Sequence, residues 1–206
     1  MLIYLLILVF SIILHVFGHL ITALFFKVKV HAFSLGFGKV LLHAKWKGID
    51  WRLSLVPFGG YCDIEESLDK PNSLSNLDYW KQVIILMAGV FLNLLVALLC
   101  YIISNKSIID GFLFDMNFIY LFMTKSPELY YLFPTDLELY LFYGSFLNIT
   151  MFLFNILPIP ALDGGYLWIL LFKNKKTENF YNRLIKVFFV LLLLAQVLLI
   201  AWWWVA

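Results

Sequence analysis

The sequence predicts an all-α membrane protein with about four transmembrane helices and a small membrane-associated β-hairpin or sheet after the first. Apolar residues make up 63% of the 206 residues and charged residues only 14%, whereas a soluble domain carries about 25% charged residues. Lipid must therefore be part of the solvent. The apolar residues also gather into runs close to the roughly 20 residues that span a bilayer. We expect one membrane-embedded domain over residues 1–206.

Four apolar runs are predicted to span the membrane. They extend from Leu2 to about Phe26, from about Val83 to Ile103, from about Leu137 to Leu157 and from about Val187 to Val205. The first run lacks a basic N-terminal region and a small-residue cleavage site, so we interpret it as a retained span and not as a signal peptide. The segment between the second and third spans is expected to be a loop.

The basic residues predict the orientation. Thirteen of the 15 Lys and Arg residues lie in the loops 27–82 and 158–186, and only Lys106 and Lys125 lie in the remaining loop. Loops rich in Lys and Arg stay in the cytoplasm, so both basic loops are predicted to be cytoplasmic and both termini external. The net charge of +2 does not indicate nucleic acid as a partner, because these residues flank apolar spans.

The first basic loop contains a predicted β-region. Residues 28–56 form short β-prone stretches separated by glycines, and Trp51, Leu53 and Leu55 alternate with polar residues. The run Pro57–Gly60 is expected to end the last stretch. Residues 62–79 turn polar and acidic and are predicted to form an exposed loop.

A histidine pair lies within the first span. His15 and His19 are four residues apart, which places both imidazoles on one helix face, about one turn from each other. Two imidazoles so arranged can bind one tetrahedral metal ion. Ionisable groups inside a span are costly and indicate function by default.

A carboxylate follows the third span. In the stretch from Asn155 to Gly165, two prolines end the helix, two glycines permit a tight turn, and Asp163 lies beside those glycines. The first span enters the cytoplasm just after His19 and the third just before Asp163. The topology therefore predicts that the three side chains lie at similar depth, and a metal ion would be a suitable partner for the carboxylate.

These motifs resemble those of the site-2 protease family of intramembrane zinc metalloproteases. His15–His19 resembles the family's zinc-binding helix, with the pattern His-Glu-x-x-His, and Leu162–Gly165 resembles the signature whose Asp is the third zinc ligand. Three other stretches, Phe33–Gly38, Pro57–Tyr61 and Ala88–Asn93, resemble the membrane-associated β-region and the start of the next span. The order matches the family's from about residue 10 to 170. The chain resembles a minimal member without a PDZ or CBS domain.

The resemblance implies an enzyme of regulated intramembrane proteolysis, which cleaves a single-span membrane protein in or near its membrane segment. It implies Zn²⁺ bound by His15, His19 and Asp163, and a multi-pass protein of a bacterial cell membrane with its site near the cytoplasmic side. It further implies a set of residues that bind the substrate or support the site: Gly59, Gly60, Asn93 and Asn155.

One position departs from the family pattern. The family's general base is the Glu that follows the first His, and here Val16 occupies that catalytic position. Valine can neither accept nor deliver a proton, so the chain as written is expected to be inactive or an inactivated variant. Glu65 and Glu66 are the nearest acidic pair in the loops that could replace the base.

Two other functions stay open at this point. A non-catalytic pseudoprotease would bind transmembrane segments without cleaving them, and Val16 favours it. A small transporter or metal carrier would need further ionisable residues in its spans, and the sequence has essentially none there beyond His15 and His19. The asparagines of the spans, including Asn148, are otherwise expected to form hydrogen bonds between helices.

Overall fold

The computed structural model describes residues 2–128, 132, 135–159, 162–171, 183–184 and 187. The chain divides into two compact units, Met1–Leu153 and Phe154–Ala206. The boundary falls near the end of a helix, and each unit is described by itself below. Apart from Val187, the predicted fourth span lies outside the described residues, as does most of the loop 158–186.

Three helices among the described residues are long and apolar enough to cross a membrane: α1 (Leu2–Phe25), α2 (Tyr79–Ile103) and α4 (Asp136–Ile156). They match the first three predicted spans to within about four residues at each end. Large apolar side chains such as Phe10, Phe91 and Phe154 are more than half exposed on their surfaces, which fits helices surrounded by lipid.

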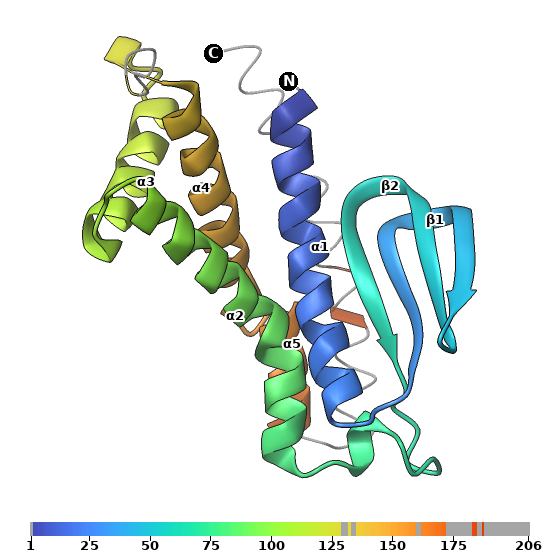
Figure 1. The fold of residues 1–206 in the computed structure, drawn as a ribbon. Helices are drawn as coiled ribbons and strands as arrows, with labels where there is room; N and C mark the ends of the chain where they lie inside the picture. The colour runs from blue at the N-terminus through green and yellow to red at the C-terminus, as the bar shows by residue number, and fades with distance from the viewer. Residues whose placement is uncertain are drawn as a thin grey trace. The chain divides into compact units, whose positions relative to one another are not determined.

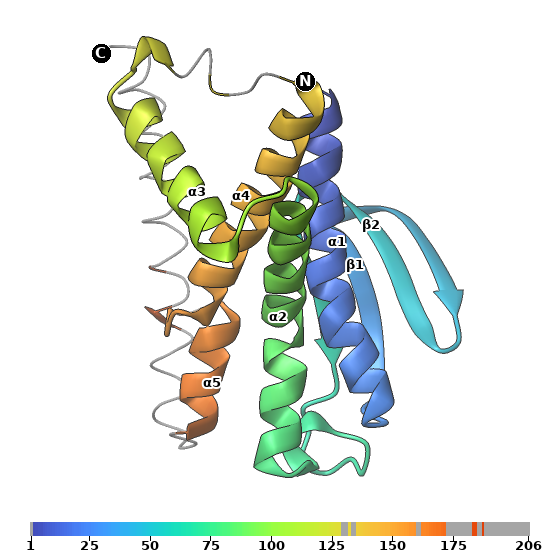
Figure 2. The ribbon, with the colours of Figure 1, turned by 60° about the vertical axis from the view of Figure 1, so that its left-hand side comes forward.

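Helix α1 packs between α2 and the sheet of the first unit (Figures 1 and 2). The α1–α2 contact is close because glycines meet there. A Cβ atom added at Gly18 would lie 2.8 Å from the Ala88 carbonyl oxygen and 2.9 Å from Gly89 Cα. Small residues of this kind let helix backbones approach each other in membranes. On another side of α1, Ile12, Val16 and Leu20 belong to an apolar core shared with the sheet.

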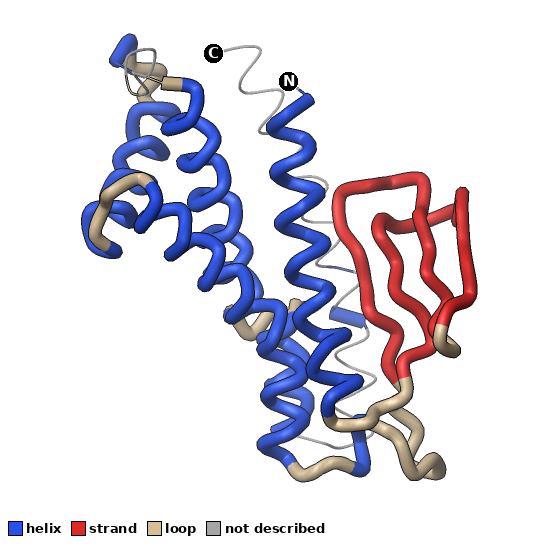
Figure 3. Tube along the Cα trace, viewed as in Figure 1, coloured by secondary structure: helices blue, strands red, loops and turns tan. Residues whose placement is uncertain are grey.

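The sheet consists of two long, bent strands, β1 (Val30–Trp46) and β2 (Ile49–Ile64), which pair antiparallel (Figure 3). The outer arm Val40–Trp46 pairs with Ile49–Ser54, and the inner arm of β1 pairs with Gly60–Ile64. In addition, Ala32–Leu35 runs beside Asp50–Leu53 in the same direction. The predicted sheet is therefore confirmed. Among the described residues, the arm Val40–Trp46 pairs on one side only and so forms an open edge of the sheet.

The outer hairpin has one apolar and one polar face. The pairs Leu42–Leu53 and Trp46–Ile49 are apolar, while the intervening pair Lys45–Asp50 is charged, as the alternation of a strand requires. Leu42 is 67% exposed and Trp46 60%. On the polar face, Asp50 accepts a hydrogen bond from Arg52 Nε at 2.7 Å. An exposed apolar face of this kind suits a membrane-associated sheet.

Two local predictions in this region are wrong. The stretch Pro57–Gly60 does not end the strand, since β2 continues to Ile64; register shifts and Gly59, with φ of 156°, absorb the irregular backbone. The loop 62–79 is not simply exposed either. Glu65 and Leu74 are each 6% exposed, because the Leu74 N–H donates to the Glu65 carbonyl at 2.8 Å and folds the loop back.

A helix, α3 (Ile108–Met123), occupies about half of the predicted loop between the second and third spans. Ser107 begins it as an N-cap, accepting a hydrogen bond from the Asp110 N–H at 3.1 Å. With only 16 residues and the acidic Asp110 and Asp115, this segment is too short and too polar for a search for spanning runs. The signal that could have found it is Ser107 followed three residues later by Asp110 before an apolar run, a pattern typical of a helix start.

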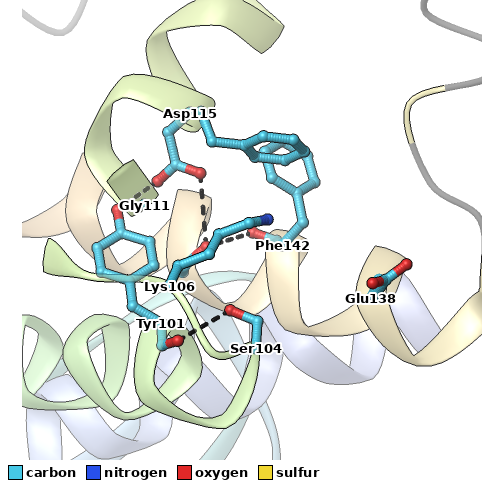
Figure 4. A pocket seen from close by; sticks show the side chains of 9 residues that line it. Tyr101, Ser104, Lys106, Gly111, Asp115, Glu138 and Phe142 are labelled. Atoms are coloured by element: carbon cyan, nitrogen blue, oxygen red, sulfur yellow. Dashed lines mark hydrogen bonds between the residues drawn. The ribbon is translucent and has the colours of Figure 1, made fainter. Parts of the chain in front are cut away.

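Asp115 fixes α3 to its neighbours (Figure 4). The carboxylate is fully buried; it accepts a hydrogen bond from the Tyr101 hydroxyl of α2 at 2.5 Å and a weaker one from Ser145 of α4 at 3.5 Å. The adjoining cavity measures about 10 Å³, room for at most one water molecule. Gly111 lets the α3 backbone lie against the Tyr101 ring.

The second unit contains the end of α4, a turn and helix α5 (Asp163–Leu171). The turn is tight: the Leu162 N–H donates to the Ile159 carbonyl at 3.2 Å, and the Gly165 N–H to the Leu162 carbonyl at 3.0 Å. A Cβ atom at Gly164 would collide with backbone carbonyls at the end of α4. The predicted stop-and-turn after the third span is therefore confirmed, and Asp163 is the first residue of the new helix.

Candidate metal centre

The two histidines of α1 face each other as expected. Their Nε2 atoms lie 3.3 Å apart, and the ring planes are nearly perpendicular, at 79°. Two nitrogens bound to one tetrahedral zinc ion at the usual 2.0–2.1 Å would be separated by about 3.3–3.4 Å. The spacing of the rings therefore fits two ligands of one metal ion without rearrangement.

Hydrogen bonds from α2 orient both rings. His19 Nδ1 lies 2.8 Å from the Ile85 carbonyl oxygen. Since a carbonyl only accepts, Nδ1 carries the proton and the His19 Nε2 lone pair faces His15. A metal-binding histidine usually has this arrangement: one ring nitrogen faces the metal and the other donates a hydrogen bond to a carbonyl or carboxylate.

Asn93 is the corresponding partner of His15. Its side chain is fully buried, and its Nδ2 lies 3.2 Å from His15 Nδ1. The amide oxygen has no hydrogen-bond partner among the residues that the structure describes. Rotating the amide by 180° brings that oxygen onto His15 Nδ1, where it accepts a proton and leaves the His15 Nε2 lone pair for a ligand. The orphaned oxygen thus fits a metal-bound state of the site.

Replacing Asn93 by leucine should weaken zinc binding about 10- to 100-fold, the usual cost of losing such an outer partner. Asn93→Asp should retain most of the affinity, because a carboxylate oxygen also accepts from His15 Nδ1–H. Competition with a fluorescent zinc chelator measures both. Equal affinities for the leucine and aspartate variants would show that Asn93 acts through packing alone.

Gly89 brings α2 close enough for these contacts. A Cβ atom at this position would lie 2.6 Å from the His15 carbonyl oxygen and would overlap the His19 ring. In the sequence, only the family resemblance drew attention to Gly89. No pattern could have indicated the Ile85 carbonyl, because every residue has a backbone carbonyl.

Val16 points toward the sheet. It is 3% exposed and belongs to the apolar core with Ile12 and Phe33. A Cβ atom added at Gly60 would lie 3.1 Å from Val16 Cγ2 and 2.7 Å from the Ser34 carbonyl oxygen. Gly60 therefore permits the close approach of β2 to α1 at Val16.

The other predicted site residues lie as follows. Gly59 is in β2 against the Phe37 ring, and Asn155 is near the end of α4 in the second unit. Asp163 begins α5, where its negative charge suits a helix N-terminus. The contributions of Gly59, Gly60 and Asn155 to substrate binding stay predictions, and so does Asp163 as the third ligand.

Glu65 is committed to a structural role. Its carboxylate lies 2.5 Å from Lys70 Nζ and 3.1 Å from His31 Nε2, and it accepts the Ser67 N–H. The hydrogen bond from Lys70, and after it the one from the Ser67 N–H, lowers the pKa of Glu65 to about 2. Such a weakly basic group is poorly suited to replace a general base near neutral pH.

The Glu65 interactions should make the loop 66–77 acid-sensitive. Because folding lowers the pKa of Glu65 from 4.5 to about 2, its stabilising contribution is complete above pH 4.5 and disappears as the pH falls toward 2. Hydrogen exchange of this loop should accelerate across that range. Glu65→Gln should exchange fast at every pH, whereas Asp69→Asn, in an exposed part of the same loop, should behave as the native chain does. An unchanged loop in Glu65→Gln would exclude this role.

Comparison with known proteins agrees with the geometry. The model of peptidase family M50, the site-2 protease family, matches residues 3–195. Among curated relatives, “Putative zinc metalloprotease Cj1068” of Campylobacter jejuni is 42% identical over 106 residues, 47% of this chain and 28% of its own. A protein of the same descriptive name from Helicobacter pylori J99 is 40% identical over 106 residues, 47% of this chain and 30% of its own. The matches thus span less than a third of either relative. With the family model covering nearly the whole sequence, the chain belongs to peptidase family M50.

Proposed function

We propose that the chain forms the membrane core of a site-2-type zinc metalloendopeptidase that acts on single-span membrane proteins. The observation that carries this proposal is the His15–His19 pair on an apolar helix, with Nε2 atoms 3.3 Å apart and with α2 positioned to accept a proton from each Nδ1. When bound, zinc supplies a Lewis acid for peptide hydrolysis.

The proposed ligands are His15, His19 and Asp163. The rings need no movement to bind, since α2 holds His19 through the Ile85 carbonyl and His15 through Asn93. Two histidines and one carboxylate are a usual ligand set of catalytic zinc. The bacterial relatives and the excess of Lys and Arg in the loops 27–82 and 158–186 support a bacterial cell membrane, with the site near the cytoplasmic side.

The chain as written is proposed to cleave poorly or not at all. Val16 holds no proton, and Glu65, held by Lys70 and His31, is not a suitable substitute. The burial of Val16 of α1 against β2 favours the second candidate, a pseudoprotease that binds transmembrane segments without cleaving them. In either case, the outer side of the arm Val40–Trp46 pairs with no strand among the described residues, so an extended substrate could add there as a further strand.

Metal analysis tests the ligand set. The purified chain should contain one zinc per molecule, and His15→Ala, His19→Ala and Asp163→Asn should each lose it. His31→Ala and His43→Ala are matched controls, because these histidines pair with Glu65 and Asp50 in the β-region; both should retain the metal. Retention of a full zinc equivalent by Asp163→Asn would exclude Asp163 as a ligand.

A further inference from the structure

An apolar groove runs between three helices of the first unit. Its walls are the stretch Ile3–Ile13 of α1, Val96 and Cys100 of α2, and the stretch Tyr140–Asn148 of α4. Its volume is about 590 Å³, within the range of sites that enclose a ligand. Since all three helices are candidate membrane spans, the ligand of such a groove would come from within the bilayer.

Asn148 lines this groove and is 1% exposed. Its Nδ2 donates to Ser11 Oγ and to the Gly144 carbonyl, each at 2.8 Å. Because the Gly144 carbonyl can only accept, the orientation of the amide is fixed. Its buried oxygen has no hydrogen-bond partner among the described residues. A buried acceptor without a donor is unfavourable, so a ligand that brings a donor to this depth would be favoured.

The depth of Asn148 restricts the source of that donor. Its partner Ser11 lies nine residues after the start of α1, which is about 14 Å along the helix, near the middle of a hydrocarbon core about 30 Å thick. Phospholipids present only methylene groups at this level, because their polar groups stay at the interface. A polypeptide carries N–H groups at every depth, and those of an unwound segment are left without intrahelical partners.

The position of the groove also suits a peptide. Ser11 and His15 are four residues apart on the same face of α1, one turn from each other. The level of Ser11 and its partner Asn148 is therefore one helical turn from His15. An extended peptide gains about 3.3 Å per residue, so roughly two residues would span that distance.

We propose that this groove receives the membrane segment of the protein substrate and that Asn148 accepts a hydrogen bond from a backbone N–H where that segment is unwound. The inference rests on the proposed function, because it assigns the groove to the substrate of the same site. It applies equally to a cleaving and to a non-cleaving chain, since it concerns binding alone.

Photocrosslinking in lipid vesicles tests the groove. Benzoylphenylalanine is placed at Leu6 or Phe10, which line the groove, or at Leu5, which does not line it but is also exposed on α1. The probe is a synthetic 23-residue Leu-Ala peptide whose central Gly-Pro pair interrupts the helix and frees backbone N–H groups, and the matched probe lacks that pair. The peptide with the Gly-Pro pair should be captured at Leu6 and Phe10 but not at Leu5, and in preference to the matched peptide.

Two variants separate the amide from the groove itself. Asn148→Leu should lower capture about tenfold, as the loss of one hydrogen bond in an apolar site does. Val96→Phe fills the groove without altering the Asn148 amide and should abolish capture. Retained zinc shows that each variant is folded around its metal centre. Undiminished capture by both variants overturns the proposal.

Other outcomes are equally decisive. Equal capture at Leu5, Leu6 and Phe10, or adducts whose mass is that of a phospholipid, would overturn the proposal in favour of a lipid-filled surface. A native chain that holds zinc but captures neither peptide contradicts the groove alone. A chain that captures the peptide in the groove but holds no zinc contradicts the metalloprotease proposal and supports the groove as a peptide site.

Discussion

Replacing Gly89 by alanine should abolish zinc binding. The added methyl group would lie 2.6 Å from the His15 carbonyl oxygen and even closer to His19 Nε2, so α2 must move outward or the ring must turn. An outward shift of α2 removes the Ile85 and Asn93 contacts that orient the two rings, and a turned His19 ring loses the 3.3 Å spacing of the Nε2 atoms. Glycine-to-alanine exchange otherwise stabilises a helix by about 1 kcal/mol, so a loss here cannot reflect weaker helix formation. We expect zinc content to fall from one equivalent to near zero.

The controls for this result lie on the same helices. Leu95→Ala changes an exposed side chain of α2 and should keep the metal. Gly18→Ala should also impair zinc binding, although it meets the Ala88 carbonyl and Gly89 Cα and no histidine, because it forces the same two backbones apart. A full zinc equivalent in Gly89→Ala, measured by metal analysis, would show that the helices can separate without disturbing the site.

Val16→Glu should restore proteolysis. A general base usually contributes about 10²- to 10⁴-fold to the rate, and the resemblance of the motif assigns that role to position 16, one residue beyond His15. The zinc-binding rings and their α2 partners are otherwise in place. The new carboxylate would replace an apolar side chain that is 3% exposed, so some loss of stability should accompany the gain of activity. Cleavage of a cognate membrane substrate in co-expressing cells is the measurement.

Val16→Gln is the matched control. It has nearly the same size and is also polar, so it should cause a similar loss of stability, but it cannot accept a proton and should stay inactive. Equal, robust cleavage by the native chain and Val16→Glu would show that another residue is the base. If neither chain cleaves although both bind zinc, the pseudoprotease candidate is favoured.

The parts of the structure that follow from local periodicity were predictable. A spacing of four on a helix placed His15 and His19 together, and long, mostly apolar runs predicted α1, α2 and α4. The contacts that orient the histidines were harder to predict. The Ile85 carbonyl belongs to the backbone and leaves no trace in the sequence, and Asn93 became a partner of His15 only once the α1–α2 packing was known.

The failed predictions share a physical cause. Helix α3 was missed because Asp115 interrupts an apolar stretch, although its buried carboxylate accepts hydrogen bonds from Tyr101 and Ser145 of other helices. Likewise, Pro57–Gly60 would end an isolated strand, but here β2 continues, supported by β1 and by the contact of Gly60 with Val16. Tertiary contacts outweighed local preference in both places.

The open edge of the sheet has a consequence for self-association. Unpaired strand edges act as templates on which other chains add, and natural proteins commonly protect them with lysines. Lys39 precedes the arm Val40–Trp46, Lys45 lies within it, and Lys47 follows it with its Nζ 4.7 Å from the Trp46 ring. Mutual repulsion between these charges would oppose the pairing of this edge with the same edge of a second copy. Neutralising the lysines would therefore convert a potential docking edge into a site of β-aggregation.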